Sequence, residues 1–443
     1  MKEVIMFSPQ YWWIENKGMI VEGRIENINK GGGLGRVVTE ISERLPKYGY
    51  HVTVFTEKPG WIYPTDYYKL ENITHYKPVP NVDVFSIPPC THLGGRVTST
   101  CDTLYRNQPT ECVKNLDYIF TTLNYIFDFN ENLKKKLYDV KNTIIHGHDW
   151  FGAQFIYVIK TIRELPDSKT VLSVHMSSDR SEEEIKNDAR LQWEQIGCKL
   201  ADKVHGVSNY QAKLLINAYN LREEKVVCIP NGVDLEVFRP PLHREKIIDE
   251  EILKRYGLQP RKYMVFFGRI EKEKGVKELI NAYGKVSDKE IGLAIFGLMG
   301  GLKYFNDEVM TEYQKLPIEK REKIKIYTHM LPEVEKVAIL RNAFLACFPS
   351  AKEAFGLVSL EAQACGVPVI VGNAGGLPET IENKKTGILV DIKDLNSVVD
   401  GIEFAISNIE MLRENVLENR KNLEKKYSWD RIVEQYIEKL YSL

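Results

Sequence analysis

The stretch FLACFPSAKEAFGLVSLEAQACGVPVIV, residues 344–371, contains one complete unit of the expected fold. It opens with an apolar run at 344–349, which is typical of a buried strand, and its apolar spacing at 356–365 predicts a helix. Gly366 is placed to end that helix, and a second apolar run at 367–371 predicts another strand. Strand, helix and strand in this order build parallel sheets.

The same alternation of short apolar runs and amphipathic stretches extends along the chain in both directions. It predicts two doubly wound, Rossmann-like α/β domains facing a cleft. A proline-containing loop at 231–245 separates two series of strands, so we place the N-terminal domain at 1–240 and the C-terminal domain at 241–426. The further strands are expected at 3–8, 51–55, 143–148, 171–175, 203–208, 263–268, 293–297 and 323–327, and further helices at 37–49 and 277–286.

The end of the chain, residues 427–443, is expected to cross back and pack on the N-terminal domain. Its segment WDRIVEQYIEKLYSL, 429–443, has one apolar face that needs burial. Residues 60–140 lack a clear period and are interpreted as insertions around the cleft.

Composition excludes several classes of partner. The 443 residues carry a net charge of −1, and the pI is about 6.8, so no overall field would attract nucleic acid or an anionic membrane. No apolar stretch is long enough to span a membrane, and the N-terminus MKEVIMF resembles a first strand more than a signal peptide. Seven scattered cysteines without metal-type spacing favour a reducing cytoplasm, with Cys347 and Cys365 as buried thiols.

Two loops in the sequence combine glycine or cations with a strand end. KGGGLGRVV, 30–38, lies between a strand and a helix, where free helix amides favour an anion, although such a loop is also an ordinary turn. It has neither Rossmann nor P-loop spacing. GRIEKEKG, 268–275, places Arg269 and Lys274 after a strand, where they could hold a diphosphate or belong to a solvated run of charges.

Glu353 and Glu361 bracket the apolar part of the opening stretch. Glu353 falls in the loop after a strand, and Glu361 lies within the helix among residues expected to be buried. A buried carboxylate needs polar partners, and ribose hydroxyls are a suitable pair. Phe355, Gly356 and Leu357 open the helix, so its free amides would face whatever binds beside Glu353.

Two further groups of residues lie at expected strand ends. Gly375 and Gly376 precede Pro378 in a second glycine loop, which could accept an anion or simply start a helix well. His146 and His148 share one face of a strand, but no third ligand follows at a suggestive spacing, so we expect no metal. His175 ends another strand and could contact a sugar hydroxyl or serve the structure alone.

Together these residues resemble the retaining nucleotide-sugar glycosyltransferases of the GT-B fold, and among them the glycogen/starch synthases. The resemblance extends over almost the whole chain. It is carried by Lys30, Gly32, Gly33, Leu34, Gly35, Asp149, Trp150, His175, the segment 230–234, Gly268, Arg269, Lys274, Glu353, Phe355, Gly356, Leu357, Glu361, Gly375, Gly376 and the segment 427–429.

The resemblance implies a cofactor-free, metal-independent transfer of glucose from ADP- or UDP-glucose to an α-1,4-glucan, with retention. Glu353, Lys274, Arg269, His175 and Asp149 would be catalytic. Lys274 and Arg269 would stabilise the leaving diphosphate, and Glu353 would position the donor sugar. A second set of residues would bind the donor. The donor-binding set is Lys30, Gly32, Gly33, Phe355, Gly356, Leu357, Glu361, Gly375 and Gly376.

Three features leave the acceptor open. Residues 12–29 form a long segment before the glycine loop, Met176 follows His175, and NGVDLEVFRP at 231–240 is closer to transferases with small acceptors. The alternatives are therefore a transferase to a small acceptor, such as a disaccharide, sugar phosphate or lipid, and a UDP-sugar 2-epimerase. The sequence determines neither the nucleobase nor the oligomeric state.

Overall fold

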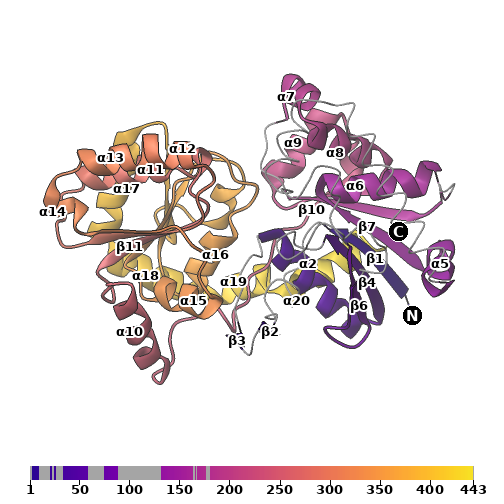
Figure 1. Ribbon diagram of the computed structural model, residues 1–443, viewed down its shortest axis with the longest axis horizontal. Helices are drawn as coiled ribbons and strands as arrows, with labels where there is room; N and C mark the ends of the chain where they lie inside the picture. Colours follow the sequence, from indigo (N-terminus) through magenta and orange to yellow (C-terminus); the bar gives the residue numbers. More distant parts are fainter. Residues whose placement is uncertain are drawn as a thin grey trace. The chain divides into compact units, whose positions relative to one another are not determined.

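The computed structural model describes residues 2–8, 20–21, 24–25, 33–57, 74–87, 131–162, 165, 167–175 and 180–442. The chain divides into two units, which are described separately (Figure 1). The first comprises Met1–Pro230 with Val433–Leu443, and the second comprises Asn231–Ile432.

The first unit is built on an eight-stranded sheet in the order β10-β9-β8-β7-β1-β4-β6-β5. Every neighbouring pair is parallel except β5 with β6. The central strands are buried on both faces, which explains why they appear in the sequence as continuous apolar runs. The strands are β1 (Lys2–Ser8), β4 (Tyr50–Glu57), β5 (Thr74–Tyr76), β6 (Val82–Ile87), β7 (Thr143–His148), β8 (Lys169–Val174), β9 (Lys203–Gly206) and β10 (Val226–Cys228).

Helices cover both faces of this sheet, with α6 and α8 on one side and α2 on the other (Figure 1). Three helices of the first unit, α7, α8 and α9, begin at a side chain that accepts a backbone N–H. The capping residues are Ser181, Asp188 and Ser208, respectively. The helices are α2 (Gly33–Arg44), α5 (Glu131–Tyr138), α6 (Asp149–Tyr157), α7 (Glu182–Asn187), α8 (Ala189–Leu200) and α9 (Asn209–Tyr219). The short strands β2 (Ile20–Val21) and β3 (Arg24–Ile25) pair antiparallel.

The second unit has a six-stranded, all-parallel sheet in the order β13-β12-β11-β14-β15-β16. The order reverses between β11 and β14, which lie side by side although about eighty residues of chain separate them. Ligands bind at such a switch point in open α/β sheets. The strands are β11 (Tyr263–Phe267), β12 (Gly292–Phe296), β13 (Ile324–Tyr327), β14 (Leu345–Phe348), β15 (Val369–Gly372) and β16 (Gly387–Val390).

Helices again lie on both faces, with α11, α13 and α17 opposite α15 and α18 (Figure 1). Helix α16 ends at Cys365, and Gly366 follows with a φ of 78°, the left-handed conformation that commonly terminates helices. The helices of this unit are α10 (Glu245–Arg255), α11 (Val276–Lys285), α12 (Leu302–Tyr304), α13 (Met310–Lys315), α14 (Ile318–Arg321), α15 (Glu333–Arg341), α16 (Leu357–Ala364), α17 (Leu395–Ser407), α18 (Ile409–Glu418) and α19 (Arg420–Tyr427). Helix α20 (Trp429–Lys439) begins in the second unit, and its residues from Val433 onward belong to the first.

The fold class predicted from the sequence is confirmed, since both units are parallel α/β sheets covered by helices. Each of the ten expected strands is present within about two residues of its predicted ends. The strands β2, β3, β5, β6, β10 and β16 were not predicted. Cys347 and Cys365 are buried free thiols, as expected. No helix within the described ranges is long and apolar enough to cross a membrane.

Candidate active site

Lys274 and Glu353 form an ion pair at the carboxyl edge of the second sheet. Lys274 ends the 3₁₀ turn Lys272–Lys274 after β11, and Glu353 lies in the loop between β14 and α16. The Nζ–Oε2 distance is 2.7 Å, and the side chains are 18% and 25% exposed. Of the predicted catalytic residues, these two meet directly. Because the ammonium has three N–H groups and Glu353 takes one, two remain for other acceptors.

The backbone around Glu353 is held by a close approach of two loops. The Glu353 carbonyl accepts the Gly376 N–H at 3.0 Å. Gly375 has a φ of 59°, and a Cβ there would lie 1.8 Å from the same carbonyl oxygen. Only glycine fits this position, so the glycine pair predicted to bind donor also determines where the Glu353 carboxylate lies.

The loop that carries Lys274 is tied to the Glu353 loop in the same way. The Ala351 N–H donates to the Glu273 carbonyl at 2.7 Å. Gly275 has a φ of 72°, and a Cβ there would lie 2.4 Å from the Pro349 carbonyl oxygen. The contacts hold the β11 and β14 loops together at the switch point, which positions the Lys274–Glu353 pair.

Helix α16 begins beside this pair. Gly356 is its N-cap with a φ of 110°, and no side chain of the described residues caps the helix there. Phe355 is buried and packs at a ring distance of 6.0 Å from Tyr427, while Leu357 starts the helix. An uncapped helix start next to a lysine is an electropositive place, which suits an anionic group.

Glu361 is buried one turn further along α16, and its ion-pair partner is a residue that the sequence did not suggest. Its Oε2 lies 2.6 Å from Nζ of Lys336 on α15, and the Glu361 side chain is only 6% exposed. Lys336 also lies over the Phe238 ring, 5.4 Å from its centroid. A ribose remains a proposed partner for the carboxylate. No local pattern around Lys336 could have indicated this contact.

Arg269, the second predicted cation, points elsewhere. Its guanidinium pairs with Glu271 at 2.8 Å, and its side chain is 67% exposed. Glu271 is itself packed against Gly300, where a Cβ would lie 2.0 Å from Cγ of Glu271. Arg269 therefore lies at the correct edge of the sheet, but it is engaged by a neighbouring carboxylate and not by Glu353.

In the first unit, His148, Asp149 and His175 meet at the carboxyl ends of β7 and β8. Asp149 starts α6 with a φ of 52°, an uncommon conformation for a residue with a side chain. Its Oδ1 accepts the backbone N–H of His175 at 2.6 Å. His148 Nδ1 lies 3.1 Å from His175 Nε2, and the rings stack with centroids 5.3 Å apart. The two predicted residues, Asp149 and His175, are thus brought together, and His148 contacts His175.

These histidines belong to a group of four that also includes His146 and His205, in which His175 is half-buried and the other three are fully buried. Burial is the main cause that lowers the pKa of each, with repulsion from neighbouring histidines as a further cause for three of them. The pKa falls to about 3 for His175 and to about 4 for His205, so all four are neutral near pH 7.

A chain of hydrogen bonds runs through two of the four rings. His205 Nε2 donates to the Ile229 carbonyl at 2.7 Å, so its neutral Nδ1 accepts, and the Ser173 hydroxyl donates to it at 2.8 Å. Ser173 then accepts from His146 Nε2 at 2.7 Å, and His146 Nδ1 accepts the Tyr441 hydroxyl at 2.7 Å. Both nitrogens of His146 and of His205 therefore have partners within the protein.

The final segment of the chain contributes to this group. Besides Tyr441, Tyr436 of α20 is buried, with its hydroxyl 3.1 Å from His205 Nδ1. The two tyrosines lie within Val433–Leu443, which the structure counts with the first unit. The apolar face of 429–443 indicated burial, but it did not indicate a hydrogen bond to a histidine.

Several predicted residues cannot be placed. Lys30, Gly32 and Met176 lie outside the described residues, as do most of 12–29 and of 60–140. Gly33 is the first residue of α2. Within the part of the chain that the structure describes, no group of three or more His, Cys, Asp or Glu residues is arranged to hold a metal ion.

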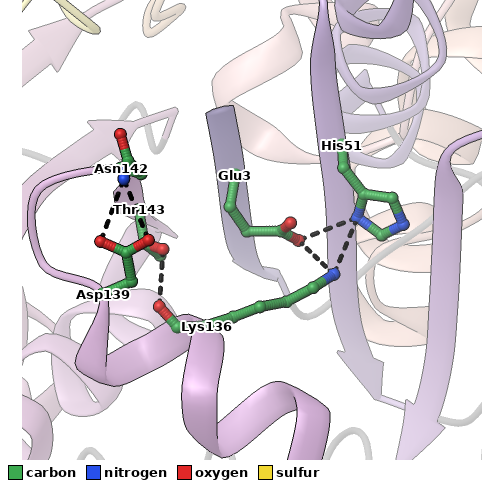
Figure 2. A pocket seen from close by; sticks show the side chains of 6 residues that line it. All are labelled: Glu3, His51, Lys136, Asp139, Asn142 and Thr143. Carbon is green, nitrogen blue, oxygen red and sulfur yellow. Dashed lines mark hydrogen bonds and ion pairs between the residues drawn. The ribbon is translucent and has the colours of Figure 1, made fainter. Parts of the chain in front are cut away.

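A pocket of the first unit lies at the opposite, amino-terminal edge of its sheet. Figure 2 shows that Lys136 and His51 converge on Glu3, whose Oε1 lies 3.0 Å from Lys136 Nζ and 2.9 Å from His51 Nδ1. The remaining lining residues are Asp139, Asn142 and Thr143. Its charged groups already pair with one another, and ligands of such sheets bind at the carboxyl edge, so we assign no catalytic role to this pocket.

Comparisons with known proteins agree with the two-unit architecture. A family model described as "Glycosyl transferases group 1" matches residues 249–423, and one described as "Glycosyltransferase Family 4" matches 31–237. The D-inositol 3-phosphate glycosyltransferase of Paenarthrobacter aurescens is 34% identical over 200 residues, which cover 44% of this chain and 46% of that protein. The match thus spans less than half the length of that relative.

Two solved structures resemble the whole chain. Sucrose-phosphate synthase from Thermosynechococcus elongatus has a TM-score of 0.71 at 19% identity, covering 100% of this chain and 98% of that one. The catalytic domain of starch synthase IV from Arabidopsis thaliana has a TM-score of 0.72 at 16% identity, covering 99% of each chain. The two parallel α/β units are therefore those of the GT-B class. Residues 249–423 resemble the group 1 glycosyltransferases of that class, and residues 31–237 resemble glycosyltransferase family 4.

Proposed function

We propose that this protein is a retaining glycosyltransferase that moves a hexose from a nucleotide sugar to a small acceptor carrying several hydroxyls, such as a sugar phosphate or polyol phosphate. The observation that carries the proposal is the Lys274–Glu353 pair, held by glycine-dependent loop contacts at the switch point of the second sheet. Its cation and the uncapped start of α16 suit a diphosphate, and its carboxylate suits a sugar.

The roles follow from where charge develops. When the bond between the anomeric carbon and the diphosphate oxygen breaks, negative charge grows on the phosphate, and Lys274 would stabilise it with the N–H groups that Glu353 does not use. Glu353 would hold the sugar as its anomeric carbon becomes cationic. The acceptor oxygen then bonds to that carbon on the face that the phosphate leaves, and its proton passes to the departing phosphate.

Further residues would bind the donor. Glu361 would accept hydrogen bonds from the ribose, next to the ion pair that its buried carboxylate forms with Lys336. Arg269 would exchange Glu271 for a phosphate, since its side chain is exposed and its present partner adjoins the same edge. His175 and Asp149 would contact sugar hydroxyls from the first unit.

The choice of a small acceptor is supported by the relatives. The Paenarthrobacter protein is named for D-inositol 3-phosphate, and the Thermosynechococcus structure is a sucrose-phosphate synthase. Elongation of an α-1,4-glucan from ADP- or UDP-glucose is the second candidate, which the resemblance at Lys30–Gly35 and the likeness to starch synthase IV favour.

The test is a matrix of donors and acceptors. Purified protein receives UDP- or ADP-hexoses with inositol phosphate, hexose phosphates, a lipid-linked acceptor or a maltooligosaccharide, and products are identified by mass and by anomeric proton couplings. A single retained product with one small phosphate ester supports the proposal. A ladder of longer glucans would move the protein to the second candidate, and conversion of the donor sugar without any acceptor would identify an epimerase.

A further inference from the structure

His148 and His175 differ from His146 and His205 in what their nitrogens contact. His146 and His205 each have hydrogen-bond partners within the protein for both nitrogens. His148 and His175 bond to each other through one nitrogen each, over 3.1 Å. Their outer nitrogens, His148 Nε2 and His175 Nδ1, are buried and have no partner among the described residues.

The shared bond links the tautomers of the two rings. A neutral imidazole carries one N–H, and the bond between His148 and His175 uses exactly one such hydrogen. If His148 Nδ1 donates, His175 Nδ1 must be an N–H donor and His148 Nε2 an acceptor. If His175 Nε2 donates instead, both outer nitrogens have the opposite character. Whether His175 offers a ligand a donor or an acceptor is therefore linked to the tautomer of His148.

The unsatisfied outer nitrogen of His175 indicates that this pair serves a ligand. A buried polar atom without a partner is costly, so native proteins rarely retain one without a reason. The backbone is also built to present this pair, because Asp149 adopts its unusual φ of 52° and holds the His175 N–H at 2.6 Å.

We infer that His148 is a positioning residue for glycosyl transfer, which holds His175 and sets the hydrogen-bonding character of its outer nitrogen toward a substrate hydroxyl. The inference rests on the proposed function for the hydroxyl, but the arrangement of the two rings is a property of the protein alone. His148 lies at the end of β7 and is fully buried, so it acts through His175 and does not bond to the substrate itself.

The experiment compares three variants of the full chain. His148→Phe keeps an aromatic ring for stacking but removes the shared hydrogen bond. His148→Asn places an amide where Nδ1 was and can restore that bond. His146→Phe is the matched control, since it disturbs the same group of four while leaving the His148–His175 bond intact.

Two readouts separate positioning from packing. The ¹⁵N shifts of labelled His175 report its tautomer without any substrate, and we expect them to change in His148→Phe but to remain near those of the parent in His148→Asn and His146→Phe. With the donor and acceptor that the parent uses, kcat/KM should fall about tenfold in His148→Phe, the equivalent of one hydrogen bond, and recover to within about threefold in His148→Asn.

The outcomes are distinguishable from failure of the proposed function. A parent protein that transfers nothing from any donor would overturn the proposed function, while the nitrogen shifts would still test the pairing of the rings. The inference is overturned if His148→Phe leaves the His175 shifts unchanged. It is also overturned if His146→Phe alters the His175 shifts and kcat/KM as much as His148→Phe does, because both changes would then reflect packing alone.

Discussion

Acid should destabilise the first unit through its buried histidines, and the size of the effect can be worked out from their pKa values. The pKa of each is lowered by folding, to about 3 for His175 and about 4 for His205, from 6.5 in an exposed imidazole. Folding lowers the pKa of a base that it keeps neutral. The folded state is therefore most stable at pH values above the unfolded pKa, where the base is neutral in both states. As the pH falls below 6.5, the unfolded chain gains protons that the folded protein cannot take up, and stability is lost.

Between pH 7.5 and pH 5.5 the free energy of unfolding falls by about 1.4 kcal/mol per histidine. Protonation of an unfolded imidazole with a pKa of 6.5 raises the population of the unfolded state about tenfold over that interval, relative to a folded state that takes up no proton. The folded pKa values of His175 and His205 lie below the interval and do not enter. For these two histidines together, the free energy of unfolding should fall by about 3 kcal/mol, and His146 and His148, whose pKa values burial also lowers, should add to that loss. That is a large fraction of the stability of a typical domain.

Urea unfolding at the two pH values measures this loss. His205→Gln tests it cleanly, since a glutamine amide can still donate to the Ile229 carbonyl but takes up no proton in either state. The loss of stability between pH 7.5 and 5.5 should be about 1.4 kcal/mol smaller in His205→Gln than in the parent protein. His243→Gln is the control, because His243 is exposed. An equal pH dependence in His205→Gln and the parent would refute the reasoning, since His205 would then be protonated in the folded protein as well.

Four further predictions concern the candidate site. Glu353→Ala and Lys274→Ala should each lower kcat by ~10²-fold with a smaller change in KM, and the double variant should be little worse than either. If the losses of kcat from the two single variants add up in the double variant, their action as a pair is contradicted. Glu361→Ala should weaken donor binding by about tenfold in calorimetry with kcat nearly retained, and a collapse of kcat would contradict that role. Gly375→Ala should reduce turnover by displacing the Glu353 carbonyl while far-ultraviolet circular dichroism stays unchanged; full activity would show that the close contact is dispensable. Dialysis against a chelator should leave the rate unaffected, and restoration by a single divalent ion would disprove metal independence.

Much of the fold was readable from the sequence because parallel strands buried on both faces appear as short apolar runs. The strands β7 and β11 were predicted nearly to the residue for this reason. The edge strands β10 and β16 are only three and four residues long, so their apolar signal is weak. Glu353 and Lys274 could be named beforehand, since glycine and charge at strand ends are local signals and parallel strands bring their carboxyl ends to one edge.

The pairing of side chains depended on the tertiary structure. Nothing near Lys336 in the sequence indicates Glu361, and nothing near His146 indicates Tyr441, which is almost three hundred residues away. The sequence by itself determined which residues stand at the edges of the two sheets, because that depends on local patterns of apolar residues and glycine. The packing of β7, β8, β9 and the final segment decided which histidines are neutral and which have all their hydrogen bonds satisfied. It also decided which of them keep a nitrogen for a ligand. Burial and hydrogen bonding of this kind arise only when distant segments meet.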